Sequence, residues 1–199
     1  MRTVKTRFLM ISDTHSVAPA SSRATNQAYR EPLPSADVLI HAGDLTLNGR
    51  MKEYQIMFEM LKRAKAELKL VIPGNHDLSL DAPFYTRRGR IMHDGVVEDV
   101  DAVKELWTGA EAGKHDIIYL EEGVSTFRLK SGATLTVLFP PAVPKYHFAG
   151  KNADRNRYTL LHTIQDFLEV LSSILIPKTV SLRLAMALIQ CHHIPRSMS

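Results

Sequence analysis

The fold class of this chain of 199 residues is decided by one stretch, Leu70-Val71-Ile72-Pro73-Gly74-Asn75-His76-Asp77. Its apolar residues run into Pro-Gly, which is typical of an interior strand of a parallel sheet. Such sheets carry their chemistry just past the carboxyl ends of their strands. Gly74 allows a sharp turn there, because a glycine backbone has no side-chain penalty. Three polar residues follow directly, so we expect other strands to end in matching polar residues.

Two earlier segments of the chain end in this way. Residues 7–12 contain the apolar run Phe8 to Ile11 and lead into Asp13-Thr14-His15, and residues 37–42 contain the apolar run Val38 to Ile40 and lead into Gly43-Asp44. Residues 68–72 are the third predicted strand, and apolar residues at helical spacing predict a helix at 51–66. The order strand, connection, strand, helix, strand predicts an α/β fold with parallel pairing.

The rest of the chain predicts smaller elements. Up to Phe139 we expect a loop at 81–89, a helix at 97–107 and strands at 117–120, 126–129 and 134–139. A hairpin turn joins the last two strands. Beyond Phe139 several prolines interrupt the pattern, and apolar spacing then predicts a helix at 161–175 and a shorter one at 182–189.

The composition is ordinary for a soluble globular protein, with 45% hydrophobic and 23% charged residues. The net charge of +4 suits an anionic substrate but is too weak to indicate nucleic-acid binding. Cys191 is the only cysteine, so an internal disulfide is excluded and a reducing, cytoplasmic location is the simpler interpretation. Charges and a proline interrupt the apolar region at 167–189, so we expect no membrane span. The sequence leaves the oligomeric state open.

The polar residues at the three strand ends are of the types that bind divalent metals. Residues two apart on a strand share a side, so Asp13 and His15 can converge. Carboxylate, amide oxygen and imidazole ligands suit Mn²⁺, Fe or Zn²⁺. Two such metals, about 3.5–4 Å apart, can share a carboxylate and activate a phosphate ester for hydrolysis.

Together the three motifs, each following a predicted strand, resemble those of the calcineurin-like metallophosphoesterase family, in its phosphodiesterase-type branch near the metallophosphoesterase domain-containing proteins. The resemblance implies a four-layer α/β/β/α sandwich, here with an incomplete second sheet. It implies two divalent metals, Mn, Fe or Zn, although this chain could hold a single one. It also implies that a hydroxide bridging the two metals attacks phosphorus in line.

The resemblance further implies a role for each motif residue. Asp13 and His15 would bind the first metal. Asp44 would bridge both metals, and Asn75 would bind the second. His76 would be the general acid that protonates the leaving oxygen. Asp77, the second residue expected at the catalytic centre, would either orient His76 or cap the next turn.

This chain departs from the family pattern in its later part. The family's remaining ligands lie in Gly-His and Gly-His-x-His segments, and no Gly-His pair occurs here. The later histidines that could replace them are His93, His115, His147, His162, His192 and His193. We therefore expect a metallophosphoesterase domain at 1–138 and a divergent tail at 139–199, partly helical and poorly ordered. The tail is either a genuine divergent ending or an artefact of the gene model.

The sequence as a whole predicts metal-dependent hydrolysis of a phosphodiester or another small phosphorylated substrate. The alternative is a catalytically impaired family member that binds a single metal or a phosphorylated ligand, because the later ligands are missing. Two further interpretations concern single residues. Arg87, Arg88 and Arg90 would either clamp a phosphate or form a solvated basic loop. His41 and Trp107 are interpreted as core residues.

Overall fold

The computed structural model describes residues 4–19 and 31–139. They fall into two compact units, of which the larger contains residues 7–119 and the smaller contains residues 4–6 with the hairpin segment at 120–139. The helices predicted at 161–175 and 182–189, with the rest of the predicted tail beyond Phe139, lie outside the described residues. No helix within the described residues is long and apolar enough to cross a membrane.

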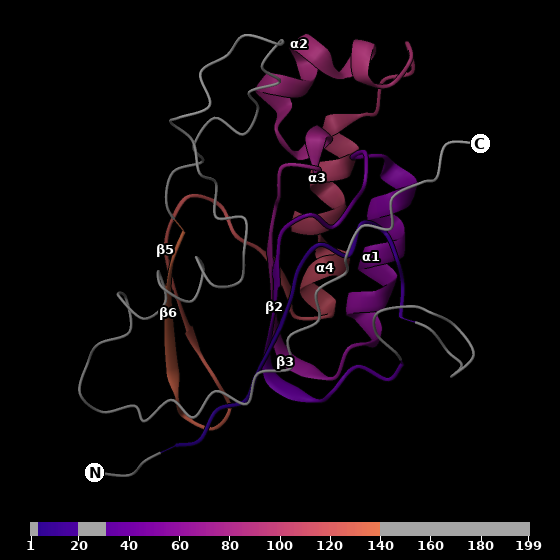
Figure 1. Ribbon diagram of the computed structural model, residues 1–199. Coiled ribbons are helices and arrows are strands. Elements are labelled where there is room, and N and C mark those ends of the chain that lie inside the picture. The colour runs from indigo at the N-terminus through magenta and orange to yellow at the C-terminus, as the bar shows by residue number, and fades with distance from the viewer. Residues whose placement is uncertain (1–3, 20–30, 140–199) are drawn as a thin grey trace, which may run out of the picture. The chain divides into compact units, whose positions relative to one another are not determined.

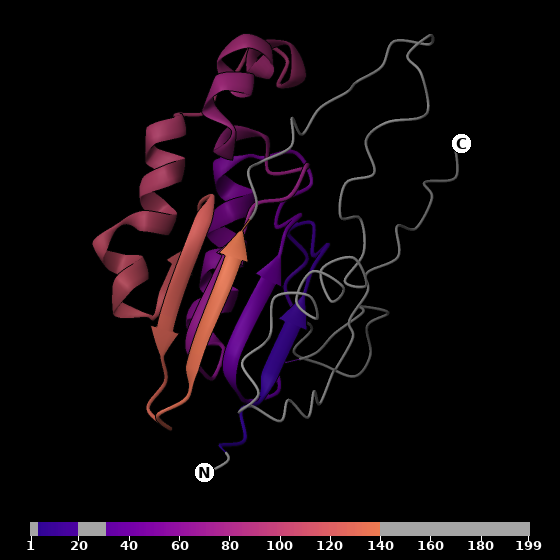
Figure 2. The ribbon, with the colours of Figure 1, turned by 90° about the vertical axis from the view of Figure 1, so that its left-hand side faces the viewer.

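A parallel sheet of four strands forms the centre of the larger unit, in the order β1-β2-β3-β4. Its strands are β1 (Phe8–Ile11), β2 (Ala36–Ala42), β3 (Ala66–Ile72) and β4 (Ile117–Tyr119). The register pairs Ile11 with His41 and Ala42 with Ile72, so the first three strands end side by side. Figure 2 shows β1 and β2 as neighbouring arrows that point the same way. The strands predicted at 7–12, 37–42, 68–72 and 117–120 are confirmed to within two residues at each end, as is the α/β class.

Three helices cover one face of this sheet (Figure 1), namely α1 (Met51–Arg63), α3 (Val100–Thr108) and α4 (Ala110–Lys114). Trp107 of α3 is fully buried in this layer, as predicted. Its ring meets those of Tyr54 and Phe58 on α1 edge to face, with centroids 6.2 and 5.6 Å apart. These contacts hold the helical layer together over the sheet.

Two predicted helices are shorter than expected, for local reasons. The first ends at Arg63 instead of residue 66, because the backbone is already extended at Ala64. The second begins at Val100 instead of residue 97, because the Asp99 carboxylate caps its first turn.

The prediction of a loop at 81–89 is wrong, because a short 3-10 helix η1 (Leu78–Leu80) leads into a further helix, α2 (Ala82–Met92). The Asp81 carboxylate accepts a hydrogen bond from the Phe84 amide at 3.0 Å, and a proline lies in the first turn. Both features start helices. Figures 1 and 2 show α2 beyond the carboxyl ends of the parallel strands. The arginines at 87, 88 and 90 are exposed on this helix, and their role as a phosphate clamp stays a prediction.

The smaller unit is an antiparallel hairpin of β5 (Gly123–Arg128) and β6 (Thr134–Phe139). The Leu129 amide donates to Ala133 O at 2.8 Å and closes the turn that was predicted between the two strands. Within the described residues these two strands make up the whole of the second sheet.

Candidate metal centre

The first two motifs are joined by backbone hydrogen bonds at the carboxyl edge of the parallel sheet. The Asp13 amide donates to Gly43 O at 3.1 Å, and the His15 amide donates to Asp44 O at 3.1 Å. These bonds continue the pairing of β1 and β2 past the ends of the strands. The turns that carry Asp13, His15 and Asp44 are therefore held in a fixed register.

These two turns contain strained backbone. Asp13, His15 and Asp44 have φ angles of 55°, 44° and 52°, in the left-handed region that residues other than glycine seldom adopt. Each such residue costs roughly 1–3 kcal/mol and persists only where its surroundings hold it. Because strain of this kind clusters at functional sites, these turns mark a candidate site.

The third motif approaches the second so closely that neither glycine can carry a side chain. A Cβ atom on Gly74 would overlap the amide nitrogen and Oδ1 of Asp44. A Cβ atom on Gly43 would lie 3.0 Å from the Gly74 Cα, and Gly43 has a φ of 103°. The His76 amide then donates to Asp44 Oδ1 at 3.0 Å. This close approach brings His76 to Asp44.

Three of the predicted site residues form one group of donors, made of His15, Asp44 and His76. One ligand atom from each lies within 4.8 Å of the other two. The rings of His15 and His76 meet edge to face with centroids 4.8 Å apart. All three residues are half-buried, so they are accessible to a metal ion and a substrate.

Backbone carbonyls orient both imidazole rings of this group. His15 Nδ1 lies 3.0 Å from Thr46 O, and His76 Nδ1 lies 2.8 Å from Leu47 O. A carbonyl only accepts, so each Nδ1 carries a hydrogen and each Nε2 is left for another ligand. Histidines that bind metals commonly donate their other ring nitrogen in this way. The donor set therefore fits a divalent metal such as Zn²⁺, Mn²⁺ or Fe.

The Asp77 carboxylate is buried and ties the second turn to the third. Oδ1 accepts from the Thr46 amide at 2.9 Å and from its hydroxyl at 2.8 Å. Oδ2 accepts from the Leu45 amide at 3.2 Å and the Gly74 amide at 2.7 Å. Burial raises the pKa of Asp77 to about 6, against the opposite effect of the hydrogen bond from Gly74. The interpretation that this side chain caps the next turn is wrong, since it makes no capping bond to η1.

The other assignments from the motifs stay predictions. Asp13 lies on the first turn but outside the three-donor group, and Asn75 lies between Gly74 and His76 on the third turn. The proposal that Asp77 orients His76 also stays a prediction. Thr46 was not predicted from the sequence. It is fully buried, its carbonyl contacts His15 Nδ1, and its hydroxyl donates to the Asp77 carboxylate. A single threonine after the Gly-Asp motif carries no periodic signal that could have revealed it.

Three consecutive carbonyls after this threonine each accept a hydrogen bond from a side chain. Leu47 O is bound by His76, as described above. Asn48 O lies 2.6 Å from His93 Nε2, and Gly49 O accepts from Ser79 Oγ at 2.7 Å. The loop at 47–49 is thereby fixed to the segment that carries the third motif.

Two of the later histidines fall within the described residues, and neither belongs to the three-donor group. His93 is buried, and its other ring nitrogen lies 2.6 Å from the Tyr85 hydroxyl. Its two ring nitrogens are therefore both engaged. His115 lies beside Glu111 of α4, with Nε2 3.2 Å from the carboxylate. The remaining candidates lie outside the described residues, namely His147, His162, His192 and His193.

Beneath the first two turns, His41 of β2 contacts Thr14. His41 is fully buried, which confirms its interpretation as a core histidine. Its Nε2 lies 2.9 Å from Thr14 Oγ1. Burial lowers the pKa of His41 to about 3, and the charge of nearby His15 acts in the same direction. The ring is therefore neutral at physiological pH.

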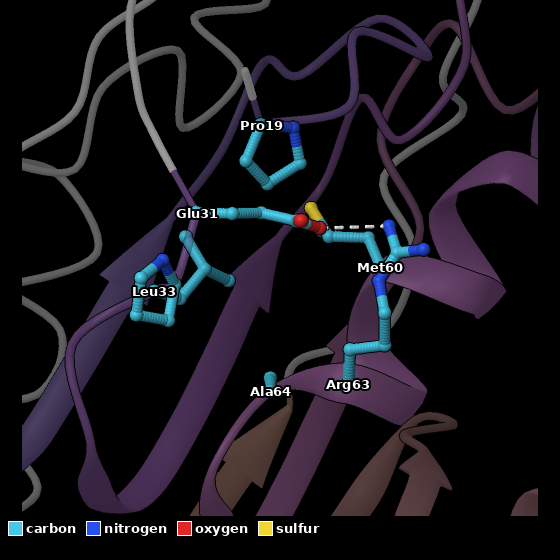
Figure 3. Close-up of a pocket in the computed structure, with 7 residues that line it drawn as sticks. Pro19, Glu31, Leu33, Met60, Arg63 and Ala64 are labelled. Atoms are coloured by element: carbon cyan, nitrogen blue, oxygen red, sulfur yellow. Dashed lines mark ion pairs between the residues drawn. The ribbon is translucent and has the colours of Figure 1, made fainter. Parts of the chain in front are cut away.

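A separate cavity of about 350 Å³ lies elsewhere on the larger unit (Figure 3). It is lined by Pro19, Glu31, Pro32, Leu33, Met60, Arg63 and Ala64. Arg63 and Glu31 form an ion pair of 2.8 Å at this cavity. Leu33 leads into β2 and Ala64 leads into β3, so the cavity belongs to the amino edge of the sheet, opposite the candidate metal centre.

Comparisons with known proteins agree with the motifs. The family model of the calcineurin-like phosphoesterases matches residues 6–169, which extends past the predicted domain end at 138. Probable rhamnogalacturonate lyase C of Emericella nidulans is 31% identical over 140 residues, covering 70% of this chain and 11% of that protein. Human metallophosphoesterase domain-containing protein 1 is 40% identical over 79 residues, covering 40% of this chain and 21% of that protein. The chain thus spans less than a quarter of either relative.

Among solved structures, phosphopantetheinyl hydrolase from Mycobacterium tuberculosis matches 85% of this chain and 51% of its own, with a TM-score of 0.41 and 18% identity. The family model is the stronger finding, because it covers most of the chain and includes all three motifs. Its members are phosphoesterases that depend on divalent metals, in agreement with the donor group of His15, Asp44 and His76. The chain belongs to the calcineurin-like phosphoesterase family.

Proposed function

We propose that this chain hydrolyses phosphate esters with the help of divalent metal, and that its substrate is a phosphodiester or another small phosphorylated molecule. The observation that carries this proposal is the three-donor group, in which one atom each of His15, Asp44 and His76 lies within 4.8 Å of the other two. Two proposed metal ligands and the proposed proton donor would thus face the same substrate at the carboxyl edge of the sheet. Membership of a phosphoesterase family supports the reaction class. The net charge of +4 suits an anionic substrate.

The metal ligands in this proposal are Asp13, His15, Asp44 and Asn75. Bound divalent metal would activate water and neutralise the charge that develops on the phosphate. His15 offers Nε2, because Thr46 O engages Nδ1. Asp44 is fixed by the His76 amide on Oδ1, and it would be shared where two metals bind.

His76 has the role of general acid. Its Nδ1 hydrogen is bonded to Leu47 O at 2.8 Å, so Nε2 is the ring nitrogen that can release a proton. A protonated ring would transfer the Nε2 hydrogen to the leaving oxygen and stay anchored through Nδ1. General acids of this kind contribute about 10²–10⁴-fold to the rate.

The test is hydrolysis of bis(4-nitrophenyl) phosphate by the purified full chain with Mn²⁺, Fe²⁺ or Zn²⁺. We expect turnover that needs metal and is stimulated most by Mn²⁺. Asp44→Asn should abolish it, and His76→Ala should lower it by about 10²–10⁴-fold. His115→Gln is the matched control, because His115 lies beside α4 and should be replaceable without loss. Absence of turnover of both this diester and the monoester 4-nitrophenyl phosphate, with all three metals and in folded protein, would contradict the proposal.

A second candidate function is that of a catalytically impaired family member that binds one metal or a phosphorylated ligand. The contacts of His93 favour it, because both of its ring nitrogens are engaged away from the three-donor group. Elemental analysis of the preparation used for the activity assay separates the two candidates. One metal per chain without turnover supports the second, and about two metals per chain exclude it.

A further inference from the structure

We propose that His41 is a positioning residue of the metal centre, which acts through the Thr14 hydroxyl and sets the affinity of the first two turns for divalent metal. This inference rests on the proposed function in one respect, namely that His15 and Asp44 are metal ligands. It goes further by giving a role to a buried side chain that touches neither metal nor substrate.

The buried Thr14 hydroxyl connects the turn that carries Asp13 and His15 with the turn that carries Asp44. Thr14 lies between Asp13 and His15 and is only 2% exposed. Its Oγ1 lies 2.9 Å from His41 Nε2, 3.1 Å from Met57 Sδ and 3.4 Å from Leu45 O. Leu45 directly follows Asp44, so this one hydroxyl contacts both turns that carry the proposed ligands.

Hydrogen bonding assigns the donor between His41 and Thr14. His41 Nδ1 has no hydrogen-bond partner among the described residues. If His41 Nε2 carries the hydrogen and donates to Thr14, the threonine can pass its own hydrogen to Leu45 O or Met57 Sδ. The opposite arrangement would use the threonine hydrogen on His41 and would leave a buried N–H at Nδ1 without an acceptor. The first arrangement satisfies more groups, so His41 donates to Thr14.

Packing alone gives no reason for an imidazole at this position. His41 is fully buried in a strand whose neighbours are apolar, and one ring nitrogen is left unpaired there. Such a group lowers stability relative to an aliphatic residue that fills the same space. Thr14, which contacts His41, belongs to the turn in which Asp13 and His15 have left-handed backbone angles. Such a turn persists only if surrounding contacts hold it in place. The bond from His41 provides such support.

The experiment measures the dissociation constant of Mn²⁺ by isothermal titration calorimetry, without substrate. His41→Leu should raise it by about 10–100-fold, the usual effect of removing a partner that orients a metal ligand. His41→Gln, whose amide can still donate to Thr14, should stay close to wild type. Thr14→Val should match His41→Leu, and Thr14→Ser should match His41→Gln. Combining His41→Leu with Thr14→Val should add little to either change, because both remove the same bond.

Val103→Ala is the control for lost stability, because Val103 is fully buried on α3. It should lower the free energy of unfolding and leave the dissociation constant unchanged. If His41→Leu does not fold, the dissociation constants of Mn²⁺ for Thr14→Val and Thr14→Ser decide the question by themselves. The inference would be overturned if His41→Leu and Thr14→Val bound Mn²⁺ as tightly as wild type. It would also be overturned if the wild type bound no metal. Metal binding that follows this series without any turnover would refute the proposed function and uphold the role of His41.

Discussion

Replacing His41 by glutamine should change how the stability of the metal-free protein depends on pH. Burial lowers the pKa of His41 from 6.5 to about 3. Between these values the unfolded chain binds a proton at this residue and the folded chain does not. Stability therefore falls as the pH falls through this range, and above pH 6.5 the residue has no effect. Glutamine does not titrate, so the variant lacks this loss.

At pH 5.0 the loss due to His41 is about 2 kcal/mol, since the pH lies 1.5 units below the unfolded pKa and each unit is worth about 1.36 kcal/mol. Asp77 has the opposite effect. Its pKa is raised from 3.8 to about 6, so the folded chain binds that proton first and gains stability as the pH falls. The two effects nearly cancel in the wild type between pH 6 and pH 4. The informative quantity is therefore the difference between variant and wild type.

Urea unfolding at pH 7.5 and pH 5.0, followed by the fluorescence of Trp107, measures this difference. Trp107 is the only tryptophan and is fully buried. We take the free energy of unfolding of His41→Gln minus that of wild type. This difference should be about 2 kcal/mol more favourable to the variant at pH 5.0 than at pH 7.5. Ile40→Val, on the same strand, should lose about 0.5–1.5 kcal/mol equally at both. If the free energy of unfolding changes equally with pH in His41→Gln and wild type, burial does not keep His41 neutral in the folded chain, and the prediction is wrong.

Three further substitutions test the contacts around the site. Asp77→Asn replaces one acceptor oxygen by an NH2 group, which then faces backbone N–H donors that have lost their acceptor. It should lower the free energy of unfolding by about 3 kcal/mol at pH 7.5, and a urea midpoint equal to wild type would contradict this. Gly74→Ala should weaken Mn²⁺ binding at least tenfold in calorimetry, because its Cβ would displace Asp44. Unchanged affinity would show that the turns of the second and third motifs can move apart freely. Tyr85→Phe removes the hydroxyl between His93 Nδ1 and the Glu98 amide. It should lower the free energy of unfolding by about 1–3 kcal/mol. A gain in stability would contradict this and would mean that the hydrogen-bond network is strained.

The parallel sheet and the motif turns could be predicted because their determinants are local. Each of the first three strands of the sheet contains a short apolar run, and each motif follows its strand within a few residues. Helix α2 was missed for a local reason as well. The segment predicted as a loop at 81–89 contains a proline, but this proline stands in the first turn after the capping Asp81, where it favours a helix.

The interior of the site could not be predicted, because its contacts join residues far apart in the chain. Asp77 binds the Thr46 amide across 31 positions, and His41 meets Thr14 across 27. Neither pairing leaves a pattern in a single sequence. The motifs indicated which side chains do chemistry, whereas the structure identifies the buried groups that hold them.

The loop at 47–49 sets a condition on how a substrate can reach His76. Swinging the loop aside would break side-chain bonds to His76, Ser79 and His93 together, and the first of these bonds orients the His76 ring. A mobile lid has few such bonds, so that it can open at low cost. This loop is therefore a fixed wall of the site, and a substrate must enter from another side and match the shape of the wall.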